Sequence, residues 1–209
     1  TAKYLHDEGY NIVISYNKSN KDAKKIFTEL NSYRKNSCQV IKIDFLSIKD
    51  YESISKKIIK FFGRVDVLVN NASRFYPTQI NKINEKNWHD IIDTNLKSAL
   101  FFSKSFYPEL KKRNGCIINI VDIHVNPPLK DHIIYNISKA GLLALTKTLA
   151  KDLAPSIRVN SISPGAIMWA EADAKKINKQ KEILSKIPLN KTGSPNDIAK
   201  AILFLIKDA

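Results

Sequence analysis

The feature that most constrains the fold is the alternation of strand-like and helix-like segments along the chain. Short apolar runs bounded by polar turns predict strands at 10–16, 39–43, 65–69, 116–121 and 157–162. Helical periodicity predicts helices at 1–8, 22–32, 51–62, 85–105 and 132–153, with two more after residue 165. Strands that alternate with helices form parallel sheets with helices on their faces. The sequence therefore predicts one α/β domain over residues 1–209, with a doubly wound, Rossmann-like sheet.

Proline and glycine mark where this pattern is interrupted. We expect Pro108 to close the long helix at 85–105, because proline lacks the backbone N–H that a helix interior needs. A dinucleotide-binding fold opens with a strand and a glycine-rich turn at a helix N-terminus. The six glycines, at positions 9, 63, 115, 141, 165 and 193, are too far apart for that turn. We therefore expect a chain truncated at both ends, without the first strand and its turn and without the last strand. Intact-mass measurement of the expressed protein would test this, and a well-folded 23.7 kDa species would contradict it.

Composition and charge exclude some classes of protein. A hydrophobic content of 44% argues against disorder, and no apolar run reaches the roughly 18 residues of a membrane span. The polar first residues do not resemble a signal peptide. Cys38 and Cys116 are expected to be buried free thiols in a reducing cytoplasm. The sequence thus favours a cytoplasmic protein that does not bind a membrane.

The net charge of +14 admits two interpretations. One is a basic patch that binds nucleic acid. The other is a lysine-rich solvated surface. Because the lysines are scattered and are not interleaved with aromatic residues, we favour the solvated surface, with attraction of an anionic dinucleotide as a side effect.

A tyrosine, a lysine and an aspartate indicate the chemistry. Tyr135 and Lys139 lie four residues apart and hence on one face of the predicted helix. A nearby ammonium group lowers the pKa of a tyrosine, which is otherwise about 10, and makes it a usable acid. Asp122 follows the strand at 116–121. Together with residues 70–78, Asn-Asn-Ala-Ser-Arg-Phe-Tyr-Pro-Thr, this pattern resembles the short-chain dehydrogenase/reductase family, and within it the pteridine reductases.

The resemblance implies roles for four catalytic residues. Tyr135 would pass a proton to the substrate atom beside the hydride acceptor, and Lys139 would hold the nicotinamide ribose and lower the tyrosine pKa. Asn95 resembles the helix asparagine that anchors a water for proton supply. Asp122 stands where most of the family has serine, and an acid there suits protonation of a ring nitrogen. The alternative for Asp122 is a cap of the following turn.

The resemblance also implies a cofactor and a substrate site. The segment Asn17-Lys18-Ser19 lacks the acid that selects NAD and suits a 2′-phosphate, which favours NADPH. The other expected cofactor contacts are Asp44, Phe45, Asn71, Ala72, Ser73, Tyr135, Lys139, Pro164 and Gly165. Expected at the substrate are Ser73, Asp122 and Tyr135, Phe75 stacked on one face of a pterin, and Trp169 and Glu171 in the loop that follows.

The sequence thus predicts an NADPH-dependent reductase of a dihydropterin or dihydrofolate. No metal site is expected, and by resemblance the protein would be a homo-oligomer, with a tetramer as the family's form. Two alternatives remain open. One is a reductase of another substrate, such as a 3-oxoacyl thioester. The other is an inactive binding protein on the same fold, which uses its basic surface on nucleic acid.

Overall fold

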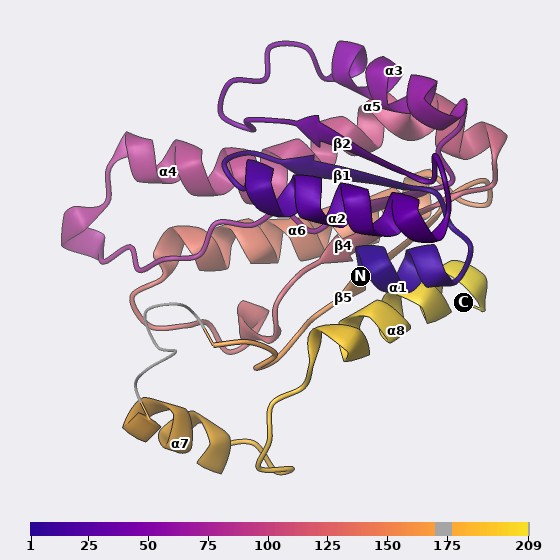
Figure 1. The fold of residues 1–209 in the computed structure, drawn as a ribbon. Coiled ribbons are helices and arrows are strands. Elements are labelled where there is room, and N and C mark those ends of the chain that lie inside the picture. The colour runs from indigo at the N-terminus through magenta and orange to yellow at the C-terminus, as the bar shows by residue number, and fades with distance from the viewer. Residues whose placement is uncertain (170–176, 209) are drawn as a thin grey trace.

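The computed structural model describes residues 1–169 and 177–208 and shows strands covered by helices (Figure 1). Every strand pair is parallel: one sheet has the order β1-β2 and the other the order β3-β4-β5. This confirms the predicted α/β class. Within the described residues no strand lies between β1 and β3. The strands are β1 (Ile12–Tyr16), β2 (Cys38–Lys42), β3 (Val67–Asn70), β4 (Cys116–Ile120) and β5 (Arg158–Ile162).

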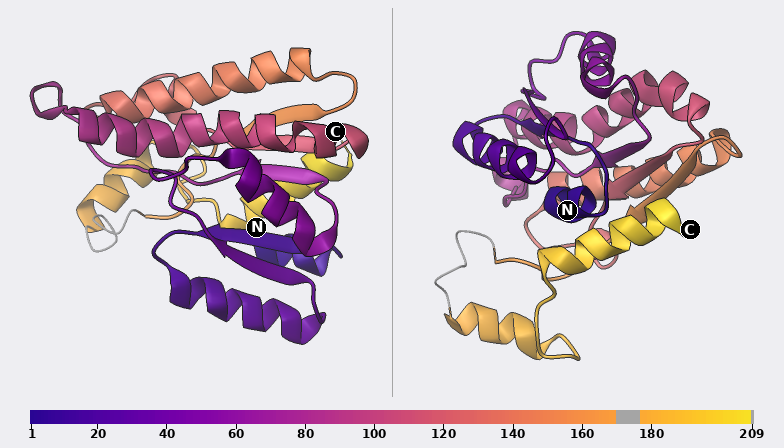
Figure 2. Two further views of the ribbon diagram at one scale, coloured as in Figure 1. Left: turned by 90° about the horizontal axis from the view of Figure 1, so that it is seen from above. Right: turned by 45° about the vertical axis from the view of Figure 1, so that its right-hand side comes forward.

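The helices form layers on both faces of the three-stranded sheet (Figure 2). Apolar residues of α3, α5 and α6 pack on one face, and those of α1 and α8 pack on the other. The α-helices are α1 (Ala2–Asp7), α2 (Asn20–Tyr33), α3 (Tyr51–Phe62), α4 (Glu85–Ile92), α5 (Ser98–Lys112), α6 (Ile133–Asp152), α7 (Ile177–Ser185) and α8 (Pro195–Lys207). Shorter turns are the 3₁₀ helices η1 (Ile80–Lys82) and η3 (Ile123–Val125) and the π-helix η2 (Asp93–Lys97).

The central strand β4 carries the core. Ile117 and Ile118 are both fully buried, and alternation along the strand sends them to opposite faces. Ile117 packs with Phe102 and Phe106 of α5. Ile118 packs on the other face with Leu5 of α1 and Ile202 of α8. A strand buried on both faces is nearly continuous in apolar residues, and β4 follows this rule except at Asn119.

The predicted end of the long helix at Pro108 is wrong. Helix α5 contains Pro108 and continues to Lys112. The helix tolerates the lost backbone hydrogen bond because the turn beyond it buries Leu110 completely in the core next to Phe106. The same predicted helix is also divided by η2, which separates α4 from α5.

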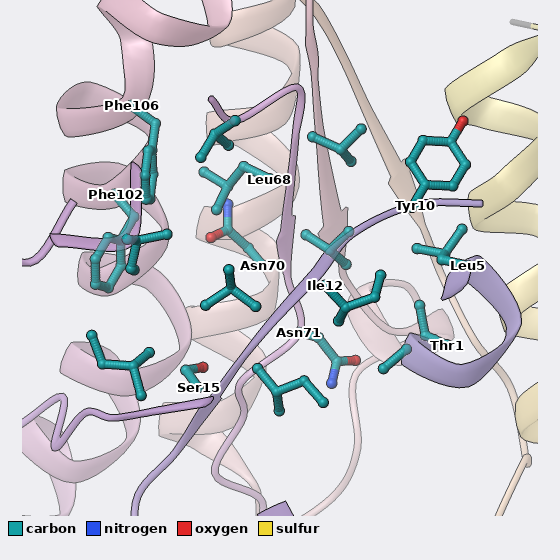
Figure 3. A pocket seen from close by; sticks show the side chains of 18 of the residues that line it. Thr1, Leu5, Tyr10, Ile12, Ser15, Leu68, Asn70, Asn71, Phe102 and Phe106 are labelled. Atoms are coloured by element: carbon teal, nitrogen blue, oxygen red, sulfur yellow. The ribbon is translucent and has the colours of Figure 1, made fainter. Parts of the chain in front are cut away.

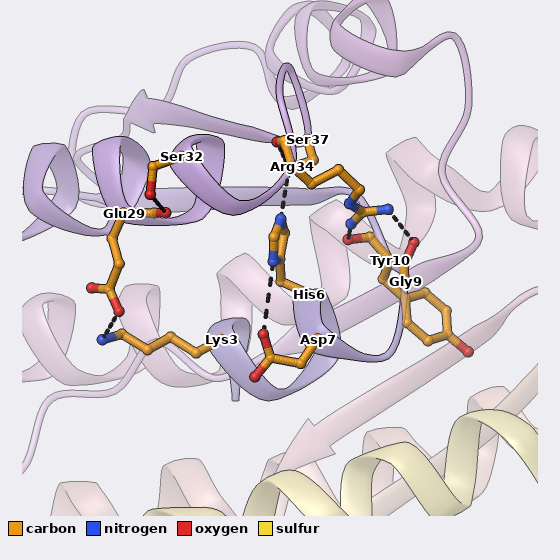
Figure 4. A network of polar contacts seen from close by, with 9 residues as sticks. All are labelled: Lys3, His6, Asp7, Gly9, Tyr10, Glu29, Ser32, Arg34 and Ser37. Atoms are coloured by element: carbon orange, nitrogen blue, oxygen red, sulfur yellow. Dashed lines mark hydrogen bonds and ion pairs between the residues drawn. The ribbon is translucent and has the colours of Figure 1, made fainter.

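Polar contacts attach α1 to the start of β2 (Figure 4). The buried His6 contacts Ser37 with its Nε2 atom 2.6 Å from the serine Oγ. Arg34, at the end of α2, donates to the carbonyl groups of Gly9 and Tyr10. These contacts fix the turn that leads into β1.

Two composition-based predictions can be compared with the structure. Cys38 and Cys116 are buried free thiols, as predicted. In the described part of the chain, no helix is long and apolar enough to cross a membrane.

Candidate active site

The predicted catalytic and cofactor residues follow the carboxyl ends of the parallel strands. Asn71 follows β3, Asp122 lies two residues after β4, and Pro164 lies two residues after β5. The Ile123 N–H donates to the Pro164 carbonyl at 3.2 Å, so the loops after β4 and β5 are joined beside Asp122. Ligands in open α/β sheets bind at this edge, outside the carboxyl ends of the strands.

Asp122 and Tyr135 form the closest contact of the site. The Tyr135 hydroxyl donates to Asp122 Oδ2 at 2.5 Å. The other carboxylate oxygen, Oδ1, accepts from the His124 N–H at 2.8 Å and caps η3. The two sequence interpretations of Asp122 are therefore compatible, because one oxygen caps the turn and the other faces the tyrosine. Tyr135 is held by α6 and is buried.

The Tyr135 pKa is raised, which contradicts the prediction that Lys139 lowers it. Burial is the largest cause, and the hydrogen bond to Asp122 and its charge add to it. Lys139 lies with its Nζ 5.7 Å from the centroid of the tyrosine ring and donates instead to the Ile120 carbonyl at 2.8 Å. Burial lowers the pKa of Lys139 to about 8, although Asp122 opposes this shift. The raised pKa favours the neutral, protonated phenol of Tyr135.

Asn95 connects three segments around the site. It lies in η2, and π-helical turns of this kind occur often at functional sites. Its amide donates to the Arg74 carbonyl and to Ser138 Oγ, both at 3.0 Å, and its Oδ1 accepts from the Arg74 N–H at 2.6 Å. Asn95 therefore binds the loop after β3 to α6, a positioning role beyond the water anchor that the resemblance implied.

The loop after β3 is held at successive residues. Arg74 pairs with Asp90 at 3.3 Å, and the Tyr76 hydroxyl donates to the same carboxylate at 3.0 Å. Between them, Phe75 contacts the Tyr135 ring edge-on, with centroids 4.8 Å apart at 76°. Phe75 is 49% exposed. The predicted substrate-stacking residue is therefore partly exposed and in contact with the predicted catalytic tyrosine.

The predicted cofactor residues form two groups. Asn17 donates to Asp44 at 3.3 Å, which joins the ends of β1 and β2, and Lys18 and Ser19 are exposed next to them. Phe45 packs edge-on against Phe102 in the core, with centroids 6.2 Å apart. This contact with the core holds the segment that would meet an adenine.

The second group is nearer to the predicted catalytic residues. Asn71 and Ala72 line the end of a cavity, and Ser73 is exposed beside them. The Lys139 ammonium has three donors, and one of them is paired with a carbonyl. A buried cation with further donors fits a hydroxyl-bearing ligand such as a ribose.

A cavity of about 650 Å³ separates β1 from β3 (Figure 3). Both strands line it with their unpaired edges, and side chains of α1 and α5 close its sides. Figure 3 shows Ile12 and Ser15 of β1 facing Leu68, Asn70 and Asn71 across it. Its walls are strand edges, so it separates the two groups of predicted cofactor residues.

The loop after β5 is only partly described. Pro164 contacts the Asp122 loop as stated above, and Gly165 is exposed. Trp169 is half-buried at the end of the described segment, and Glu171 lies outside the described residues. The predicted substrate roles of Trp169 and Glu171 remain predictions.

Two positioning residues, Ser138 and Asn119, were missed at the sequence level. Ser138, the partner of Asn95, is fully buried on α6. Asn119 is fully buried in β4, accepts from Asn70 and donates to Thr146 at 2.8 Å each. A polar residue inside an otherwise apolar strand, as at Asn119, is the sequence signal that could have identified this network.

Comparison with known proteins identifies the family. A family model described as enoyl-(acyl carrier protein) reductase matches residues 1–209. The chain belongs to the short-chain dehydrogenase/reductase family. This family membership makes it an oxidoreductase. The chain is 32% identical over 212 residues to the 3-oxoacyl-[acyl-carrier-protein] reductase of Staphylococcus aureus, covering 99% of this chain and 85% of that protein.

Other short-chain reductases give the same result. The 3-oxoacyl-[acyl-carrier-protein] reductase of Staphylococcus epidermidis is 33% identical over 209 residues, covering 99% of this chain and 85% of the relative. The 3-oxoacyl-[acyl-carrier-protein] reductase of Thermotoga maritima is 36% identical over 171 residues, covering 78% of this chain and 68% of the relative. These relatives support the predicted family and not the predicted pteridine reductase subgroup. In the described part of the chain no group of three or more His, Cys, Asp or Glu side chains is placed to hold a metal ion.

Proposed function

We propose that this oxidoreductase reduces the ring C=N of a pterin, with NADPH as the hydride donor. The observation that carries the proposal is the contact between Asp122 Oδ2 and the Tyr135 hydroxyl at 2.5 Å. This pair places an ionisable acid beside the neutral phenol. Reduction of a C=N bond adds a hydride to carbon and a proton to nitrogen, and an acid pair can deliver that proton.

The carboxylate distinguishes this acceptor from a ketone. When a ketone is reduced, negative charge develops on oxygen, and an ionised Asp122 nearby would repel it. A ring C=N nitrogen is more basic than a ketone oxygen and can be protonated before the hydride arrives, so that no anion develops on it. Tyr135 can donate its proton to that nitrogen, and water can return a proton to the phenolate through Asp122, since the two groups are in hydrogen-bond contact. The geometry therefore supports nitrogen protonation better than carbonyl protonation.

The residues fit NADPH as the cofactor, which supplies the hydride when bound. Lys139, with donors beyond its bond to Ile120, would hold the ribose hydroxyls next to the nicotinamide. Lys18 and Ser19, at the end of β1, would bind the 2′-phosphate, because a cation and a hydroxyl suit a dianion. Asn17 and Asp44, which contact each other, would line the adenosine side.

Reduction of a 3-oxoacyl thioester is the second candidate, and the names of the relatives favour it. All the relatives reported above are 3-oxoacyl-[acyl-carrier-protein] reductases. The raised pKa of Tyr135 also suits this reaction, since a protonated phenol can donate to a carbonyl oxygen. For this candidate Asp122 would have to be protonated at the moment of hydride transfer.

Both candidates can be tested with one assay. NADPH oxidation is followed by absorbance with dihydrobiopterin and, separately, with an acetoacetyl thioester as acceptor. We expect kcat/KM to be larger with dihydrobiopterin by at least about tenfold, which corresponds to about 1.4 kcal/mol. Preference for the thioester would support the second candidate and contradict the first. Turnover with neither acceptor would contradict both.

We also infer that the protein assembles through α5 and α6. Several large apolar side chains on these helices are exposed, and unpaired apolar surface of this kind marks interaction sites. They are Leu100, Phe101, Tyr107 and Ile137. Light scattering coupled to size-exclusion chromatography should show an oligomer, with the tetramer of the resemblance as the expected species, and a monomer would contradict the inference.

A further inference from the structure

A histidine at the start of α6 lies against Phe75, the partly exposed aromatic side chain beside Tyr135. The His132 ring stacks on the Phe75 ring, with centroids 4.9 Å apart and planes inclined by 15°. Phe75 in turn meets the Tyr135 ring nearly at right angles, at 4.8 Å. Phe75 is thus in contact with two rings, one parallel to it and one perpendicular.

The backbone on both sides of this stack is fixed. The Thr78 N–H donates to the Asp131 carbonyl at 2.6 Å. The buried Thr78 hydroxyl accepts from the Ile134 N–H at 3.1 Å, in the first turn of α6. The segment with Phe75 and the turn with His132 therefore form one unit, and their rings meet with little freedom to separate.

The His132 ring is itself oriented by a hydrogen bond. Its Nδ1 lies 2.7 Å from the Lys130 carbonyl oxygen. A carbonyl can only accept, so Nδ1 carries the proton in this contact. This bond fixes the ring plane that Phe75 packs against.

We propose that His132 is a specificity-determining residue of this site: its ring covers one face of Phe75 and fixes the orientation in which Phe75 meets an acceptor beside Tyr135. The proposal rests on the proposed function, because it concerns how a flat acceptor reaches the catalytic tyrosine. With one face of Phe75 covered, acceptors are selected by their fit to the exposed remainder of that ring. His132 acts through Phe75 and is a positioning residue, so its loss should affect acceptor KM more than kcat.

The first test distinguishes the contribution of the stacked His132 ring from that of its nitrogen atoms. His132→Ala removes the stacked ring, whereas His132→Phe keeps a flat ring. We expect His132→Ala to raise the KM for dihydrobiopterin about five- to tenfold and to change kcat by less than about threefold, and His132→Phe to stay within about twofold of wild type in both. His89→Ala, which removes an exposed histidine on α4, is the matched control and should leave both constants unchanged.

The second test reads the position of Phe75 without any substrate. 4-Fluorophenylalanine is incorporated, and the ¹⁹F signal of Phe75 is assigned by its loss in Phe75→Leu. Stacking shifts this signal through the ring current of His132. We expect the signal to move in His132→Ala and to remain shielded in His132→Phe. If His132→Ala does not fold, His132→Leu, which keeps bulk without a ring plane, replaces it.

The outcomes are distinct. An unmoved Phe75 signal in His132→Ala, or a KM within about twofold of wild type, would overturn the proposal. An equal rise in the KM for dihydrobiopterin in His132→Phe and His132→Ala would also overturn the proposal, because a nitrogen atom rather than the stacked ring would then matter. If wild type turns over neither acceptor, the proposed function fails, while the ¹⁹F comparison still decides whether His132 positions Phe75.

Discussion

The two sheets differ in how completely their strands are covered. In β4, Cys116, Ile117, Ile118 and Asn119 are buried, with strands on both sides and helices on both faces. In β1, no residue is fully buried, and its free edge borders the cavity shared with β3. The predicted catalytic groups follow β4 or lie on α6 and in η2, whereas Lys18 and Ser19, the predicted phosphate contacts, follow β1. We therefore predict that catalytic geometry depends on the covered sheet and cofactor choice on the open one.

The largest expected effect is a loss of catalytic activity when a residue associated with the three-stranded sheet is changed. Tyr135→Phe removes the proton donor, so we expect kcat to fall about 10³-fold, or about 4 kcal/mol. Stopped-flow NADPH oxidation measures it. Tyr33→Phe, at an exposed tyrosine of α2, is the matched control and should keep full activity. A decrease below about tenfold in Tyr135→Phe would show that another group protonates the substrate.

Unfolding should show the difference between the sheets directly. Ile118→Ala empties space in a fully buried strand and should cost about 3 kcal/mol. Ile14→Ala removes the same atoms from a half-buried position on the cavity wall and should cost about 1 kcal/mol. Urea denaturation of both variants gives the two free energies. Equal losses would mean that β1 is as well packed as β4.

The pH dependence of stability should report the burial of Lys139. Its pKa is about 8 in the folded protein and 10.5 as the ordinary value, so between these pH values the unfolded chain binds more protons. Stability from this residue therefore rises with pH across that window. The difference between wild type and Lys139→Met should grow in favour of wild type by about 2 kcal/mol from about pH 8 to about pH 10. A flat difference would place the ammonium in solvent.

The smallest effect is expected on cofactor binding by the residues that follow β1. Lys18→Ala should raise the KM for NADPH about fivefold, or about 1 kcal/mol, with little change for NADH, because only NADPH carries the 2′-phosphate. Exposure of Lys18 keeps the effect modest. Lys21→Ala, an exposed lysine on α2, is the control. Equal effects on both cofactors would remove Lys18 from phosphate recognition.

Sequence patterns predicted the elements better than the contacts between them. The helix at Tyr51–Phe62 has the predicted bounds, because its caps at Asp50 and Gly63 are local signals. The continuation of α5 past Pro108 depends on burial of Leu110, which is a tertiary effect. The site residues Asp122 and Tyr135 were predicted from motifs, and the structure places them in contact. The direction of the Tyr135 pKa shift was not predictable, because it depends on burial and on where the Lys139 ammonium points.

Asp122→Ser, measured with both acceptors, tests the central claim most directly. The substitution keeps a hydrogen-bonding group beside Tyr135 and removes the carboxylate. The proposed function predicts that kcat/KM for dihydrobiopterin falls by at least about 30-fold, while that for the acetoacetyl thioester stays the same or rises. An unchanged ratio of the two kcat/KM values would contradict the claim that the Asp122–Tyr135 pair selects a ring C=N as the acceptor.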